Sequence, residues 1–128
     1  MLSLELKAQI RDSFNALKTD MQGFKVRQSQ NKMIAEVSKT LTGEYPDHNN
    51  ILCVEAPTGT GKTFAYLLSG IPIAKANKKK LIVSSANVAL QEQLLNKDIP
   101  QAQQYCSVDF EYALVKGRSR YVCVRNLI

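Results

Sequence analysis

The residues best suited to chemistry lie near the middle of the chain, at positions 54–67, where the sequence is VEAPTGTGKTFAYL. A short apolar run leads into a glycine-containing loop and then into an apolar segment with helical character. Gly59 and Gly61 have no side chains, so the backbone there can wrap closely around an anion. Loop amides and the start of a helix would direct hydrogen-bond donors and positive dipole toward phosphates. The pattern predicts a P-loop.

Two residues at the end of this loop carry the expected chemistry. Lys62 would bring a positive charge to the β- and γ-phosphates, and the Thr63 hydroxyl would bind a magnesium ion. The general P-loop signature begins with glycine, and Ala56 stands in that place. A simple glycine-rich turn between strand and helix is the alternative. We expect a nucleoside triphosphate and Mg²⁺ as ligands, held by Ala56, Pro57, Thr58, Gly59, Thr60, Gly61, Lys62 and Thr63, with Lys62 and Thr63 as the catalytic pair.

Secondary structure around the loop is expected to alternate. Apolar runs at residues 51–56, 81–85 and 110–115 predict short buried strands, and Cys53 is expected to be packed inside the first. Helical periodicity marks residues 2–17 and 33–41, a helix after Gly61 that should break near residues 70–72, and another that should stop before Pro100. The predicted fold class is α/β: an incomplete P-loop NTPase (RecA-like) parallel sheet flanked by helices, with an N-terminal helical extension.

Composition fits an intracellular globular domain with a polyanionic partner. The chain has 128 residues, 45% of them hydrophobic, and a formal net charge of +6, which favours a nucleotide or nucleic acid. No apolar stretch is long enough to span a bilayer, and the N-terminus is too charged for a secretory signal. Three widely spaced cysteines argue against a disulfide framework. We expect a cytoplasmic protein with no membrane partner.

Four segments resemble one helicase family, in order along nearly the whole chain. APTGTGKT has the superfamily 2 helicase form of the P-loop, and SSANVALQEQL resembles the next motif of that superfamily. The segment KGRSRYVCVRNL resembles the region of the first cluster cysteine in DinG-type helicases, which are relatives of XPD. Upstream, GFKVRQSQNKMIAEVSKTL is similar to the family's adenine-recognition region. The chain is identified as the N-terminal part of a DinG-family helicase.

The resemblance implies roles for individual residues. Phe24, Arg27 and Gln30 would lie by the adenine, although Gln30 could also be a water-facing residue at a helix start and Arg27 a surface charge. Three further residues would meet the phosphates of the DNA strand: Ser85, Asn87 and Gln91. Serines at a strand end can instead cap the following helix.

Cys123 matches the first of four thiolates that hold a [4Fe-4S] cluster in the family. Family members usually have proline after this cysteine, whereas Val124 stands here. Composition alone does not favour a cluster, since four cysteines are needed and this chain has three. The cluster is implied by the resemblance.

The implied domains are an N-terminal helix at 1–22, the first part of the helicase ATP-binding domain at 23–116, and the start of the iron–sulfur insertion at 117–128. The implied activity is 5′–3′ translocation on single-stranded DNA and duplex unwinding, driven by ATP hydrolysis, in DNA repair. The full-length enzyme would act as a monomer on single-stranded DNA, junctions or forks.

Residues 1–128 are expected to be a fragment that binds nucleotide without efficient hydrolysis. No acidic pair follows an apolar strand after Thr63, and such a pair normally holds the magnesium. The alternative is a small P-loop module that binds nucleotide or nucleic acid without catalysis, and a P-loop small-molecule kinase is a weaker third choice.

Overall fold

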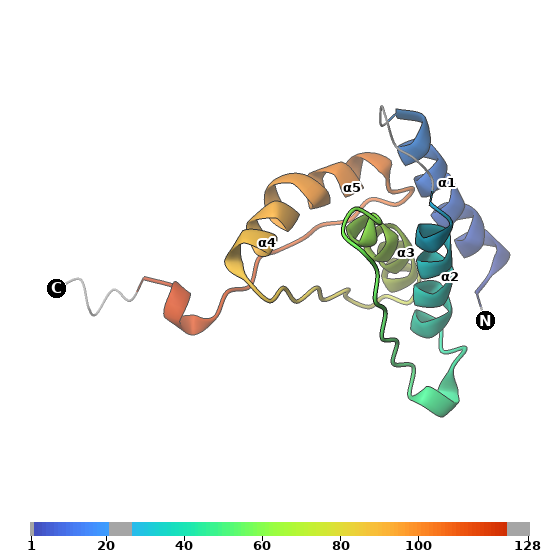
Figure 1. The fold of residues 1–128 in the computed structure, drawn as a ribbon, viewed down its shortest axis with the longest axis horizontal. Coiled ribbons are helices and arrows are strands. Elements are labelled where there is room, and N and C mark those ends of the chain that lie inside the picture. The colour runs from blue at the N-terminus through green and yellow to red at the C-terminus, as the bar shows by residue number, and fades with distance from the viewer. Residues whose placement is uncertain (1, 21–26, 123–128) are drawn as a thin grey trace.

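Three helices form the centre of the molecule (Figure 1). The structure is a computed structural model that describes residues 2–20 and 27–122. Helix α1 covers Leu4–Asp20, α2 covers Gln28–Leu41, and α3 covers Lys62–Ala76. Both α1 and α2 pack on α3. The two N-terminal helices predicted from sequence periodicity are confirmed.

Helix α3 supplies most of the core because it is apolar on nearly every side, a pattern typical of a helix buried among others. Phe14 and Leu17 of α1 and Ala102 of α5 (Ile99–Tyr105) complete the cluster. The buried apolar residues of α3 are Phe64, Ala65, Leu67, Leu68, Ile71 and Ile73. This burial fixes the helix whose first residue is the loop lysine.

The expected break near residues 70–72 is wrong. Helix α3 continues to Ala76 with Pro72 inside it. An interior proline removes one backbone hydrogen bond and strains the helix by about 3 kcal/mol. Burying each large apolar side chain contributes about 1.5–3 kcal/mol, and several such residues flank Pro72. Tertiary packing therefore outweighs the local helix-breaking signal.

The next helix also runs past its expected end. Helix α4 (Val88–Gln93) passes through a π-helical turn, η2 (Leu94–Asp98), directly into α5. Pro100 is the second residue of α5 and closely follows the π-helical turn, where the regular α-helical hydrogen-bond ladder is already interrupted. The expected stop before Pro100 is wrong. Two short 3-10 turns lie at Pro46–His48 (η1) and Arg118–Arg120 (η3).

The predicted parallel sheet is absent from the described residues. The three apolar runs form no strands and instead run as extended segments beside the helices (Figure 1), at residues 51–56, 81–85 and 110–115. Without strand pairing, many of their apolar side chains face solvent, including Ile51, Ile82 and Val115. Cys53 is exposed, so the expectation that it packs in a core is wrong here. A strand buries its residues only when neighbouring strands and covering helices are present.

The described helices include none that is both long and apolar enough to cross a membrane.

Candidate nucleotide-binding site

The loop before α3 turns through two glycines in the left-handed region. Gly59 has φ of 82° and Gly61, at the N-cap of α3, has φ of 80°. Side chains disfavour this region, so glycine is the residue suited to both positions. Thr60 is buried and its Oγ1 donates a 2.7 Å hydrogen bond to the Pro57 carbonyl. These features build a tight loop at the start of a long buried helix, as the sequence predicts.

The side chain of Lys62 folds back over the loop. Its Nζ donates to the carbonyl oxygen of Ala56 at 2.6 Å and to that of Pro57 at 2.9 Å. The ammonium group therefore lies across the mouth of the loop and is satisfied by carbonyl oxygens. Phosphate oxygens are anionic acceptors, which bind an ammonium group more strongly than neutral carbonyls do. A phosphate group would therefore compete with these carbonyls for the Lys62 ammonium group.

The N-terminus of α2 holds the loop from the other side. Gln30 is only 1% exposed, and its Nε2 donates to the Gly61 carbonyl at 3.1 Å. Arg27 Nη1 donates to the Gly59 carbonyl. A water-facing role for Gln30 is therefore wrong, whereas Arg27 is exposed yet bonded to the loop. No local sequence pattern indicated Arg27 or Gln30, and only the family resemblance implied that they lie near the nucleotide.

Tyr66 lies on α3 three residues after Thr63 and is partly buried. Burial raises the pKa of the Tyr66 phenol, a side-chain hydrogen bond with Thr63 opposes the rise, and nearby Asp98 adds to it. Asp98 itself is buried and accepts a 3.2 Å hydrogen bond from Gln93 Nε2. The described residues contain no cluster of three acidic, cysteine or histidine side chains that could hold a metal ion.

The three candidate DNA-contacting residues lie at the start of α4. Ser85 Oγ donates to the Asn87 carbonyl at 3.1 Å, and Asn87 Oδ1 accepts from the Leu90 amide at 2.9 Å. Asn87, rather than a serine, therefore caps the helix. Gln91 Oε1 accepts a 2.7 Å hydrogen bond from Arg120 Nη1. Arg120 belongs to the basic 3-10 turn η3, which also contains Arg118.

Two predicted site residues, Phe24 and Cys123, lie outside the described residues. An iron–sulfur cluster of this kind takes four cysteine thiolates, and the described cysteines are Cys53 and Cys106.

Comparisons with known proteins agree with the motifs. ATP-dependent DNA helicase DinG of Photobacterium profundum is 46% identical over 127 residues, which are 99% of this chain and 18% of that protein. DinG of Escherichia coli strain K12 is 48% identical over 98% of the chain, and DinG of Salmonella typhimurium is 47% identical over 98%. The chain spans 17–18% of the length of these relatives. The resemblance to DinG-type helicases is thereby confirmed.

A family match covers the larger part of the same region. The family described as "Type III restriction enzyme, res subunit" matches residues 23–120. That range includes α2, the loop, α3 and the segment through η3. Since the match extends over more than half of its length, the chain belongs to the family described as type III restriction enzyme, res subunit.

Proposed function

We propose that this chain is the nucleotide-binding part of an ATP-dependent DNA helicase. The observation that carries the proposal is the loop at the N-terminus of α3, with Lys62 Nζ over its mouth and Gln30 and Arg27 bonded to its carbonyls. Loop amides and Lys62 would hold the triphosphate, and Thr63 would hold Mg²⁺. Arg27, Gln30 and Phe24 would contact adenine. The names of the similar helicases support ATP as the nucleotide.

The extended segments are proposed to become strands of a parallel, RecA-like sheet when further strands pair with them. Their exposed apolar side chains, among them Ile51, Ile82 and Val115, support this assignment because such side chains suit a buried sheet. We assign residues 1–22 to an N-terminal helix, 23–116 to the first part of the ATP-binding domain, and 117–128 to the start of an iron–sulfur insertion.

The same proposal places single-stranded DNA at Ser85, Asn87 and Gln91. The basic side chain of Arg120 reaches Gln91, which supports phosphate binding in this region. Cys123 would provide the first ligand of a [4Fe-4S] cluster. ATP hydrolysis would drive 5′–3′ translocation and unwinding at junctions or forks by a monomeric repair enzyme that is cytoplasmic and nucleoid-associated.

Residues 1–128 alone are proposed to bind nucleotide without efficient turnover. Hydrolysis by P-loop enzymes also uses an acidic magnesium-binding motif and an arginine finger, and one arginine finger is worth about 1,000- to 100,000-fold in rate. Asp98, the buried acid nearest this region, bonds to Gln93 and lies by Tyr66 rather than after a strand. Robust phosphate release by the 128-residue chain with single-stranded DNA would contradict this proposal.

The decisive experiment is Lys62→Ala in the full-length protein, with Lys97→Ala as the matched control. Lys97 is exposed in the π-helical turn, so its loss removes the same charge away from the loop. We expect Lys62→Ala to abolish DNA-stimulated ATPase and unwinding while circular dichroism stays unchanged. Equal activity in the two variants would refute the nucleotide site.

Cys123→Ser in the full-length protein tests the cluster separately. We expect lower iron content and loss of unwinding with nucleotide binding retained.

Nucleotide binding without ATPase activity in the unmodified full-length protein would instead favour a second function, a P-loop module that binds nucleotide without catalysis.

A further inference from the structure

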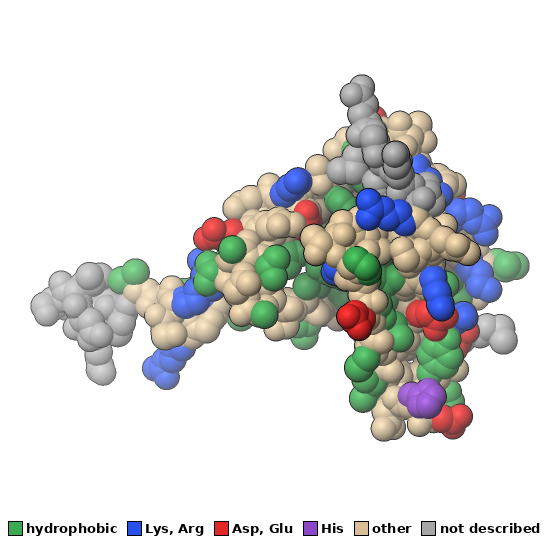
Figure 2. Space-filling model, in the orientation of Figure 1, with side chains coloured by type: hydrophobic (Ala, Val, Ile, Leu, Met, Phe, Trp, Pro, Cys, Tyr) green, Lys and Arg blue, Asp and Glu red, His purple; other side chains and the backbone are tan. Residues whose placement is uncertain are grey.

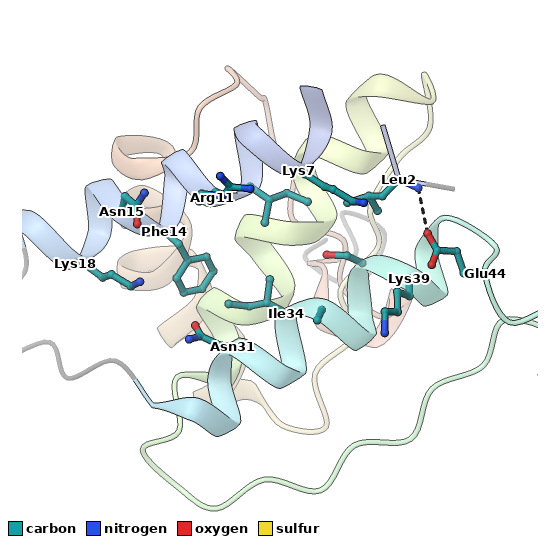
Figure 3. Close-up of a pocket in the computed structure, with 13 residues that line it drawn as sticks. Leu2, Lys7, Arg11, Phe14, Asn15, Lys18, Asn31, Ile34, Lys39 and Glu44 are labelled. Carbon is teal, nitrogen blue, oxygen red and sulfur yellow. Dashed lines mark hydrogen bonds between the residues drawn. The ribbon is translucent and has the colours of Figure 1, made fainter. Parts of the chain in front are cut away.

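A groove lies between α1 and α2 (Figure 3). Its volume is about 450 Å³, within the range of roughly 300–1,000 Å³ typical of ligand sites. The helices run antiparallel, with Lys7 near Lys39 at one end and Lys18 near Asn31 at the other (Figure 3). Both helices lie on α3, so the groove has a fixed base.

The inner part of the groove is apolar. Ile10 and Phe14 from α1 and Ile34 and Ala35 from α2 line this part, and Figure 3 shows Phe14 close to Ile34. Ile10 and Phe14 are only 6% and 5% exposed, while Ala35 is exposed on the opposite wall. An occupant with an apolar side chain could therefore extend the core outward between the two helices.

The rim of the groove is basic. Lys7, Arg11 and Lys18 follow one another on α1 at spacings that place them on one face. None of the three makes an ion pair within residues 2–20 and 27–122. Lys39, on the α2 side, pairs with Glu36 at 3.4 Å, and Figure 2 shows Lys and Arg side chains gathered over these helices.

Acidic groups near the groove are few and partly engaged. Glu44 lines one end and accepts a 3.1 Å hydrogen bond from the Leu2 amide. Glu5 and Asp12 also belong to α1 but do not line the groove. The groove thus combines an apolar floor with unpaired positive charge along one side.

We propose that this groove docks an acidic amphipathic helix of a partner protein. Along α1, residues 4–18 span roughly 21 Å at 1.5 Å per residue, the length of a helix of about 15 residues. Leucine-type side chains at i, i+4 and i+7 would enter the floor, and flanking carboxylates would meet Lys7, Arg11 and Lys18. Charge complementarity of this kind selects partners and speeds encounter.

Nucleic acid fits the groove less well. A phosphate backbone would match the basic rim but leave the apolar floor without a partner. Bases that bind single-strand sites stack on exposed aromatic rings, whereas Phe14 is buried at 5% exposure. The apolar floor therefore favours a protein helix.

The test uses full-length protein and a fluorescent synthetic peptide of about 15 residues, long enough to form a helix. The peptide carries leucines at i, i+4 and i+7 flanked by glutamates and a photo-crosslinker at one end. Matched peptides replace the glutamates with lysines or the leucines with serines. We expect only the acidic amphipathic peptide to bind in fluorescence anisotropy and to crosslink to α1 or α2.

Three protein variants locate the binding. Charge reversal of Lys7, Arg11 and Lys18 to Glu should weaken binding at least about tenfold, since each exposed ion pair contributes modestly. Reversal of Lys78, Lys79 and Lys80, which are exposed after α3, makes the same charge change outside the groove and should alter binding less than about twofold. Ala35→Trp should block the groove without changing charge. Thermal unfolding and ATPase should match the unmodified protein in all three.

Several results would overturn the proposal. Absence of binding up to about 1 mM peptide would do so, as would equal weakening by both charge reversals. Crosslinks outside α1 and α2 would place the peptide elsewhere. If a single-stranded oligonucleotide crosslinked to the groove and the peptide did not, the groove would be a nucleic-acid site.

Discussion

Replacing Gly61 with alanine should disrupt the nucleotide loop far more than the same change at two other glycines with similar backbone conformation. Gly43, Gly59 and Gly61 have φ of 75°, 82° and 80°. An added Cβ would meet Asn50 Oδ1 at 4.0 Å at Gly43 and Arg27 Nη1 at 3.4 Å at Gly59. At Gly61 it would lie 2.2 Å from Gln30 Nε2, which is too close for any real contact. The three variants therefore separate backbone strain from collision.

The structure sets the expected magnitudes. Each alanine places a side chain in the left-handed region, which costs about 1–2 kcal/mol. In Gly61→Ala the Gln30 amide must also leave the Gly61 carbonyl. Because Gln30 is 1% exposed, loss of its partner adds about 1–3 kcal/mol. Local destabilisation should be about 2–5 kcal/mol for Gly61→Ala and about 1–2 kcal/mol for Gly43→Ala and Gly59→Ala.

A double-mutant cycle with Gln30→Ala isolates the collision. Removing the Gln30 side chain eliminates the atom that the new Cβ would strike. Gly61→Ala/Gln30→Ala should therefore be about 1–3 kcal/mol less destabilised than the sum of the single variants.

Hydrogen exchange measured by mass spectrometry reports the local opening free energy in the full-length protein. A peptide covering residues 54–67 contains the loop, and a peptide around Gly43 serves as the control region. The reasoning would be refuted if Gly61→Ala opened the loop no more than Gly59→Ala. Additivity of the cycle within about 0.5 kcal/mol would refute it equally.

Three further changes test other contacts. Arg27→Ala removes the hydrogen bond to the Gly59 carbonyl, a net contribution of about 1 kcal/mol. Hydrogen exchange of the loop amides should therefore rise about fivefold, whereas hydrogen exchange in η1 should not change. Burial raises the pKa of Tyr66 above its ordinary 10.0, so the folded state holds the phenol proton more tightly than the unfolded state. Stability is then full below pH 10 and declines as pH rises through the raised pKa, and Tyr66→Phe should flatten that alkaline decline in thermal unfolding; an unchanged slope would contradict the assignment. Phe14→Ala should destabilise the helical core by about 3–5 kcal/mol, because Phe14 is buried against α3. The control is Asn15→Ala at an exposed position of the same helix. Equal melting temperatures of the two variants would show that α1 does not pack on α3.

Local sequence predicted the helices and the loop well. The periodic apolar residues of α1 and α2, and the spacing of Gly59, Gly61 and Lys62, are local patterns, and the structure reproduces the elements that they predict. The helix-stop predictions at Pro72 and Pro100 were wrong because a proline signal read from local sequence takes no account of the burial of α3 around Pro72 or of the π-helical turn just before Pro100. Strands depend on distant partners, which is why apolar runs such as residues 81–85 could be recognised without a sheet appearing among the described residues.

The sequence by itself determined where a phosphate could bind, because a glycine-rich loop followed by lysine and a helix is a contiguous pattern with a direct physical meaning. Only the tertiary structure decided that Gln30 and Arg27 hold this loop from another helix, and that the positive face of α1 borders an apolar groove. Both features join residues far apart along the chain. Their contacts arise from the packing of α1 and α2 on α3, which no local pattern specifies.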